Sequence, residues 1–138
     1  MLTIAPQLPG MKLPINVDTE LTPLANIAGI YKLLVAAPDA PLRTVPELIA
    51  YAKANPGKIS YASAGIGSSP HLAAELFRSQ AGIEIVHVPY RGGAPAIVDL
   101  VAGRVQMMIG NMTDFLGQVK GGKLRGIAFG GDRASPAL

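Results

Sequence analysis

Short apolar runs alternate with helix-like segments along most of this chain, and that alternation is the strongest constraint on its fold. The apolar runs predict strands over residues 30–37, 58–63, 83–88, 105–109 and 124–129. Between them the pattern predicts helices over residues 44–55, 70–81, 94–102 and 113–119. Strands that alternate with helices build right-handed βαβ units, and runs such as KLLVAA and VQMMIG are apolar enough for a sheet covered on both faces. The sequence therefore predicts an α/β fold, a three-layer sandwich with a mostly parallel sheet.

Regular patterning begins only at Pro23. Before it, the chain carries Pro6, Pro9, Pro14 and Gly10 and shows no sustained period, so residues 1–22 are predicted to be an extended connector. Residues 23–138 are predicted to be a single α/β ligand-binding domain. The N-terminus lacks the charged region of a signal peptide, so we do not expect one in this chain.

Composition argues against several classes of function. The chain has no Cys, which excludes disulfides and thiolate metal sites, and its two His residues show no metal-ligand spacing. Its 12 Lys and Arg against 9 Asp and Glu are dispersed, with four Tyr, three Phe and no Trp, so nucleic-acid binding is not predicted. We predict neither a metal nor a cofactor. Charged residues make up 15%, against about 25% in typical soluble domains, and this shortage predicts self-association through exposed apolar surface.

The segment YASAGIGSSPHLAAELF, residues 61–77, predicts an anion-binding turn. Gly65 and Gly67 let the backbone turn sharply, and Ser69 before Pro70 predicts a helix N-terminus with exposed amides. Such a terminus favours a carboxylate, phosphate or sulfate. The segment is neither a P-loop nor a G-x-G-x-x-G motif, so a turn that needs glycine for geometry alone stays open.

Three glycine-containing loops follow predicted strands, at residues 63–69, 89–93 and 110–113. Ligands of open parallel sheets bind beyond the carboxyl ends of the strands, where these loops lie. Arg91 could grip a carboxylate or be a solvated loop residue, and His71 could donate to a ligand or support the loop. The candidate ligand-binding residues are Ser63, Ala64, Gly65, Gly67, Ser68, Ser69, His71, Tyr90, Arg91, Gly92 and Asn111.

An enzyme is the main alternative to a binding domain. A triad could be drawn from Ser68, His71 and Asp99, but no G-x-S-x-G elbow is present, so we predict no catalytic residue. A small hydrolase or transferase domain that binds an anion at the same helix N-terminus remains an alternative. A structural interaction domain without a ligand is another. His87 is expected to be a satisfied strand residue, and Asn111 and Thr113 to cap the helix that follows.

Taken together, the motifs resemble those of the Bug-type receptors of tripartite tricarboxylate transporters. The matching segments are LTPLANIAG, TVPELIA, ANPGK, YASAGIGSSPHLAAELF, VHVPYRGGAPAIVDLVAGRVQMMIGNM, GKLRGIAFG and RASPAL. The resemblance implies a type II periplasmic-binding-protein fold, in which two lobes close on a ligand like a Venus flytrap. This chain resembles the second lobe only, with residues 1–22 as the crossover from a first lobe.

The family resemblance also implies a function. Such receptors capture carboxylates in the periplasm, namely di- and tricarboxylates, aromatic acids or acidic amino acids, and pass them to membrane permease subunits. Their second-lobe binding loops correspond to Ser63–His71, Tyr90–Gly92 and the turn at Gly110-Asn111, and relatives often carry an acidic residue at the position of Gly110. One lobe alone leaves a ligand half solvated, so we expect this chain by itself to bind weakly or not at all.

Overall fold

The structure is a computed structural model that describes residue 10 and residues 12–131. The tail RASPAL, quoted for the family resemblance, lies outside the described residues. The helices are α1 (Val17–Glu20), α2 (Val45–Ala54), α3 (Ser69–Ala81), α4 (Gly93–Val101) and α5 (Met112–Lys120). The strands are β1 (Lys32–Ala36), β2 (Ile59–Ser63), β3 (Ile85–Pro89), β4 (Met107–Asn111) and β5 (Arg125–Phe129). Every predicted strand and helix from residue 30 onward is present.

The five strands form one open sheet in the order β3-β2-β4-β1-β5. β2 pairs in parallel with β3 and with β4, whereas β1 is antiparallel to both β4 and β5. Four strands therefore run in one direction and β1 runs against them, so the sheet is mixed, with two parallel and two antiparallel pairings. The apolar pattern could not show this reversal, because a strand buried on both faces reads the same in either direction.

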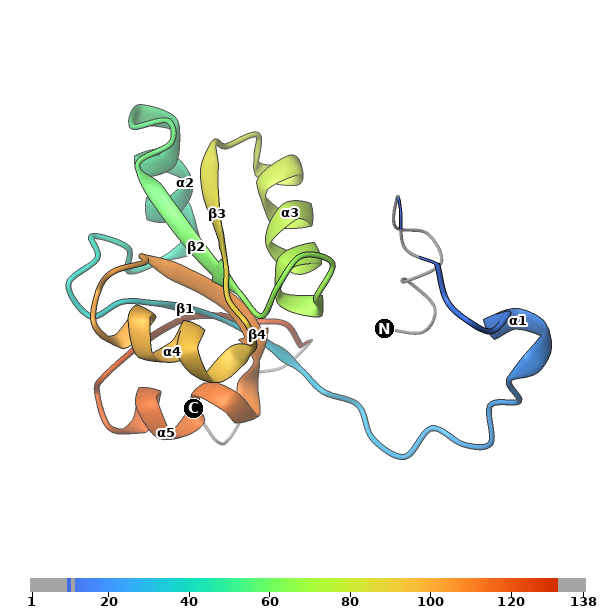
Figure 1. Cartoon of the computed structure of the whole chain (residues 1–138). Coiled ribbons are helices and arrows are strands. Elements are labelled where there is room, and N and C mark those ends of the chain that lie inside the picture. The colour runs from blue at the N-terminus through green and yellow to red at the C-terminus, as the bar shows by residue number, and fades with distance from the viewer. Residues whose placement is uncertain (1–9, 11, 132–138) are drawn as a thin grey trace.

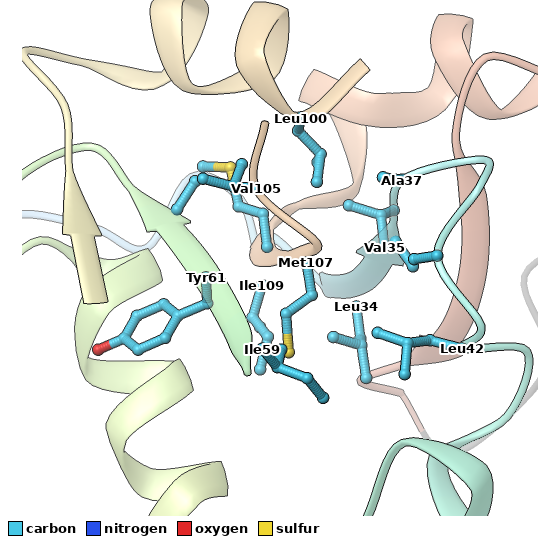
Figure 2. Close-up of a cluster of buried hydrophobic side chains, with 14 of the residues drawn as sticks. Leu34, Val35, Ala37, Leu42, Ile59, Tyr61, Leu100, Val105, Met107 and Ile109 are labelled. Carbon is cyan, nitrogen blue, oxygen red and sulfur yellow. The ribbon is translucent and has the colours of Figure 1, made fainter. Parts of the chain in front are cut away.

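Helices cover both faces of the sheet, which confirms the three-layer α/β fold (Figure 1). Val45 of α2 and Phe77 of α3 lie with Leu34 around one cavity, so these helices share a face. On the other face, Phe115 of α5 packs where a side chain on Gly110 would stand. Between the layers lies a continuous apolar core, part of which Figure 2 shows around Leu34, Tyr61, Met107 and Ile109.

Helix ends follow local sequence signals, with two shifts. Thr44 caps α2 by accepting from the Glu47 amide, and the Glu47 carboxylate accepts from the amide of Arg43, one residue before the position that a capping box uses. Gly82 ends α3 in the left-handed conformation, with a φ of 59°. The N-cap of α3 is Ser68 and not Ser69, so our assignment of the cap was one residue late. Ser69 and Pro70 instead occupy the first turn. An N–H there has no intrahelical partner, so the missing N–H of Pro70 costs no helix hydrogen bond.

Of the predicted connector over residues 1–22, positions 1–9 and 11 lie outside the described residues, and residues 12–31 before the sheet are mostly extended and exposed. Within residues 12–31 the only helix is the four-residue α1, whose first turn is capped by the Asn16 side chain. Leu24 and Ile27 are 94% and 96% exposed, and in Figure 1 this segment leads away from the sheet. At its end, the Tyr31 ring packs against Phe129 and the Tyr31 carbonyl accepts from the amide of Met112.

Candidate ligand-binding site

Three helices begin at the same edge of the sheet. β2, β3 and β4 are adjacent and point the same way, and the next element after each is a helix, α3, α4 and α5 respectively. The N-cap residues of α4 and α5, Gly92 and Asn111, make no side-chain capping hydrogen bond. A helix N-terminus carries partial positive charge and amide donors, so this edge favours an anion.

Ser63 organises the first of the three loops. Its side chain is fully buried, and its Oγ lies 2.7 Å from Nε2 of His87 and accepts from the amide of Gly65 at 3.1 Å. Ser68 Oγ donates to the Gly65 carbonyl at 2.6 Å, which closes the turn. Ser63 and Ser68 therefore shape the loop from inside.

The amides of both loop glycines are already used. The Gly65 amide donates to Ser63 Oγ, and the Gly67 amide donates to Nδ1 of His71 at 3.1 Å. The exposed amides predicted for this turn therefore do not include those of the two glycines, because side chains of the loop satisfy them first. Both glycines are needed for their backbone, with φ values of 121° and 73°. None of the hydrogen bonds among the described residues uses the amides of Ala64, Ile66 or Ser69, and these are the donors left to the loop.

A stack of rings supports the loop from the α3 side of the sheet. The rings of His71 and His87 are 4.2 Å apart, and those of His87 and Tyr61 are 4.8 Å apart. Burial, and then the nearby His71, lower the pKa of His87. The Tyr61 hydroxyl donates to Glu75 at 2.6 Å; burial and then this bond raise the pKa of Tyr61, and the bond lowers that of Glu75. His71 thus holds the loop, as the supporting interpretation predicted, and His87 takes part in the same support.

The second loop holds Tyr90, Arg91 and Gly92. The Tyr90 amide donates to the Ser63 carbonyl, which joins the two loops, and its hydroxyl donates to Asp99 at 2.8 Å. Asp99 also accepts from Arg104, and its pKa is lowered first by Tyr90 and then by Arg104. The Tyr90 hydroxyl is therefore engaged within the domain. Arg91 is exposed, and the ion pairs and side-chain hydrogen bonds found in the described part of the chain do not include it.

Lys32 is the residue that the sequence analysis missed. Its Nζ donates to Asn111 Oδ1 at 2.8 Å and also contacts Ser69 Oγ, so it joins two of the predicted loops. The antiparallel register places Lys32 opposite Asn111, at the edge of the sheet where α3, α4 and α5 begin. A lone lysine in the otherwise apolar run IYKLLVAA was the one signal that could have identified it.

Gly110 does not face this edge. A Cβ on Gly110 would lie 2.7 Å from the Phe115 ring, beneath α5. Gly110 therefore lies beneath α5, whereas Asn111 beside it reaches the edge.

The described residues match none of three other possibilities, a catalytic triad, a metal site and a membrane-spanning helix. Ser68, His71 and Asp99 do not form a triad, because each makes the separate contacts given above. In residues 10 and 12–131, no three His, Cys, Asp or Glu residues gather as metal ligands would. Within the same residues, no helix has the length and apolar character needed to cross a bilayer.

The sequence matches the model of the Tripartite tricarboxylate transporter family receptor over residues 2–138. The chain belongs to this family. Among its receptors and their relatives, the UPF0065 protein in the tcbD-tcbE intergenic region of Pseudomonas sp. (strain P51) is 45% identical over 74% of this chain and 30% of its own length. Protein BugT of Bordetella pertussis is 37% identical over 84% of this chain and 36% of its own length. The chain thus spans about a third of the length of these relatives.

Parts of several solved structures have the same fold as this chain. R. palustris Rpa4515, solved with adipate, has a TM-score of 0.75 and 35% identity over 79% of this chain and 36% of its own. The periplasmic binding protein BugD has a TM-score of 0.73 and 33% identity over 78% of this chain and 36% of its own. A periplasmic transporter reaches a TM-score of 0.90 at 30% identity and covers 98% of this chain and 45% of its own.

Proposed function

We propose that this chain forms one wall of a carboxylate-binding cleft in a periplasmic solute receptor. The observation that carries the proposal is the convergence of three helix N-termini on one sheet edge, in a chain similar to a protein solved with adipate. The receptor would deliver its ligand to the membrane subunits of a tripartite tricarboxylate-type transporter.

The proposed contacts come from the three loops and fall into two groups. The residues that offer donors to the ligand are Ala64, Ile66, Ser69, Arg91 and Asn111. Residues that give the loops their shape are Ser63, Gly65, Gly67, Ser68, His71, Tyr90 and Gly92. This division assigns ligand contact to fewer residues than the sequence predicted.

We infer binding without catalysis. The closest pairing of a hydroxyl with a ring nitrogen at this edge is Ser63 with His87, and Ser63 is fully buried. Its Oγ also accepts from the Gly65 amide and donates to the Gly65 carbonyl. A nucleophile must reach its substrate, and this hydroxyl is enclosed by its own loop.

Titration of the ¹⁵N-labelled chain with adipate tests the proposal, followed by ¹H–¹⁵N NMR spectra. We expect chemical-shift changes at Ala64, Ile66, Ser69 and Asn111, with α2 unaffected. The sequence left open whether one lobe binds weakly or not at all, and the three helix N-termini at this edge favour weak binding. Because the ligand meets only one wall of a cleft, we expect a dissociation constant of about 1 mM, or about −4 kcal/mol.

The control ligand is 1,6-hexanediol, which has the carbon chain of adipate without its charges. It should leave the same amides unshifted. Adipate that shifts no resonance at the edge, or shifts only residues elsewhere, contradicts the proposal.

A further inference from the structure

Lys32 places a full positive charge at the proposed ligand edge. Its Nζ lies 2.8 Å from Asn111 Oδ1 and contacts Ser69 in the first turn of α3. Its backbone is held on both sides, by the register with Asn111 and by the Gly130 amide, which donates to the Lys32 carbonyl at 2.8 Å. Lys32 also lines a cavity of about 210 Å³ with apolar residues such as Leu34 and Phe77. The ammonium is therefore held in position at this edge.

No carboxylate neutralises this charge among the residues that the structure describes. Both partners of Nζ are neutral oxygens, and the ion pairs found involve other cations. α3 has no acidic residue in its first turn. Two nearby carboxylates are engaged elsewhere, Glu75 by Tyr61 and Arg78 and Asp99 by Tyr90 and Arg104. The first turn of α5 contains Asp114, which is not within ion-pair distance of Lys32.

We propose that Lys32 is a specificity-determining residue, which makes this site prefer dianionic carboxylates over monoanionic ones. The inference rests on the proposed function and adds the charge of the ligand to it. Helix N-termini offer partial charges that any carboxylate can use, whereas the attraction to an ammonium grows with the charge of the ligand. A charge-assisted hydrogen bond is also stronger than a neutral one.

Lys32 could instead be a structural link between β1, α3 and β4, and the choice of variants separates the two roles. Lys32→Gln keeps a side-chain donor for Ser69 and Asn111 but removes the charge, and Lys32→Arg keeps the charge. Lys53→Gln removes an exposed lysine from α2 and is the matched control for net charge.

The experiment compares adipate with hexanoate, which has the same number of carbons and one carboxylate. Dissociation constants come from NMR titration of the wild type and the three variants. The wild type and Lys53→Gln should bind adipate more tightly than hexanoate. In Lys32→Gln this preference should fall by about fivefold, the effect of one partly exposed charge, and Lys32→Arg should retain most of it.

A second measurement uses the wild type alone, so its result does not depend on whether a variant folds. In about 0.5 M NaCl, screening should reduce the preference for adipate over hexanoate. If adipate binds but Lys32→Gln keeps the wild-type preference, or salt leaves that preference unchanged, the role of Lys32 is refuted and the proposed function stands. If adipate does not bind to the wild type at all, the proposed function itself is refuted.

Discussion

The Ser63 hydroxyl connects more of the proposed ligand loop than any other single group. It contacts the ring of His87 and both polar backbone groups of Gly65, while the Ser63 carbonyl accepts from Tyr90. Because the side chain is fully buried, water cannot take the place of the hydroxyl as the hydrogen-bond partner of these groups.

Replacement of this serine by alanine should therefore be costly. Ser63→Ala leaves the Gly65 amide and the His87 nitrogen without a partner, and we expect it to lower the free energy of unfolding by about 1–3 kcal/mol. Urea denaturation followed by circular dichroism measures the loss. Ser79→Ala, on the exposed face of α3, is the control and should change stability by less than about 0.5 kcal/mol. Equal stability of the two variants would show that Ser63 does not organise the loop.

His87 should make the free energy of unfolding depend on pH. Its pKa in the folded protein lies below the unfolded value because the ring is partly buried beside His71. The unfolded chain then binds a proton more readily than the folded protein. The free energy of unfolding therefore keeps its full value above a pH of about 6.5 and falls as the pH is lowered through that value.

The test is the free energy of unfolding at pH 7.5 and 5.5, for the wild type and His87→Gln. The wild type should lose stability on acidification, and the variant should lose less. An identical loss in both proteins would assign the effect to other groups.

At the scale of elements, two glycines near α5 have opposite surroundings, Gly110 in β4 and Gly117 in α5. Gly110 leads into the helix, and a Cβ there would meet the Phe115 ring at 2.7 and 2.8 Å. Gly117 lies within the helix, and a Cβ there would meet no atom within 4 Å.

The two positions should respond in opposite directions to alanine. Gly110→Ala overpacks the contact between β4 and α5, and we expect a loss of about 1–3 kcal/mol. Gly117→Ala should raise the free energy of unfolding by about 1 kcal/mol, since alanine favours the helix. Both changes are read from urea denaturation midpoints, and a stabilised Gly110→Ala variant would show that α5 moves away from β4 at little cost.

At the scale of the whole molecule, the extended segment before β1 is the least compact feature. Leu24 and Ile27 expose almost all of their surface, and Ile30 is 62% exposed. Exposed apolar side chains on an extended segment can pair with other copies of the chain, as the low charge content predicted.

The double variant Leu24→Ser/Ile27→Ser tests this source of self-association. We expect a lower average mass in light scattering at high protein concentration and a free energy of unfolding within about 0.5 kcal/mol of the wild type. Leu76→Ser, at an exposed position of α3, is the control for lost surface hydrophobicity. A wild-type chain that is monomeric at every concentration would contradict the prediction.

Local signals in the sequence were sufficient for most of the fold. Thr44 and Gly82 mark helix ends through contacts with residues a few positions away. The glycines at 65 and 67 mark a turn that only their φ values allow. Such features depend on short stretches of chain, so the residues themselves determine them.

Only the tertiary structure decided the direction of β1 and the composition of the ligand edge. Lys32 is 37 residues from Ser69 and 79 residues from Asn111, and the reversed β1 brings the three together. The same assembly turns His71 and Ser63 inward onto the amides of Gly65 and Gly67, in the turn where the sequence predicted exposed amides. Composition and periodicity describe which residues are buried, but strand pairing sets which distant side chains meet, and that pairing is a property of the packed chain.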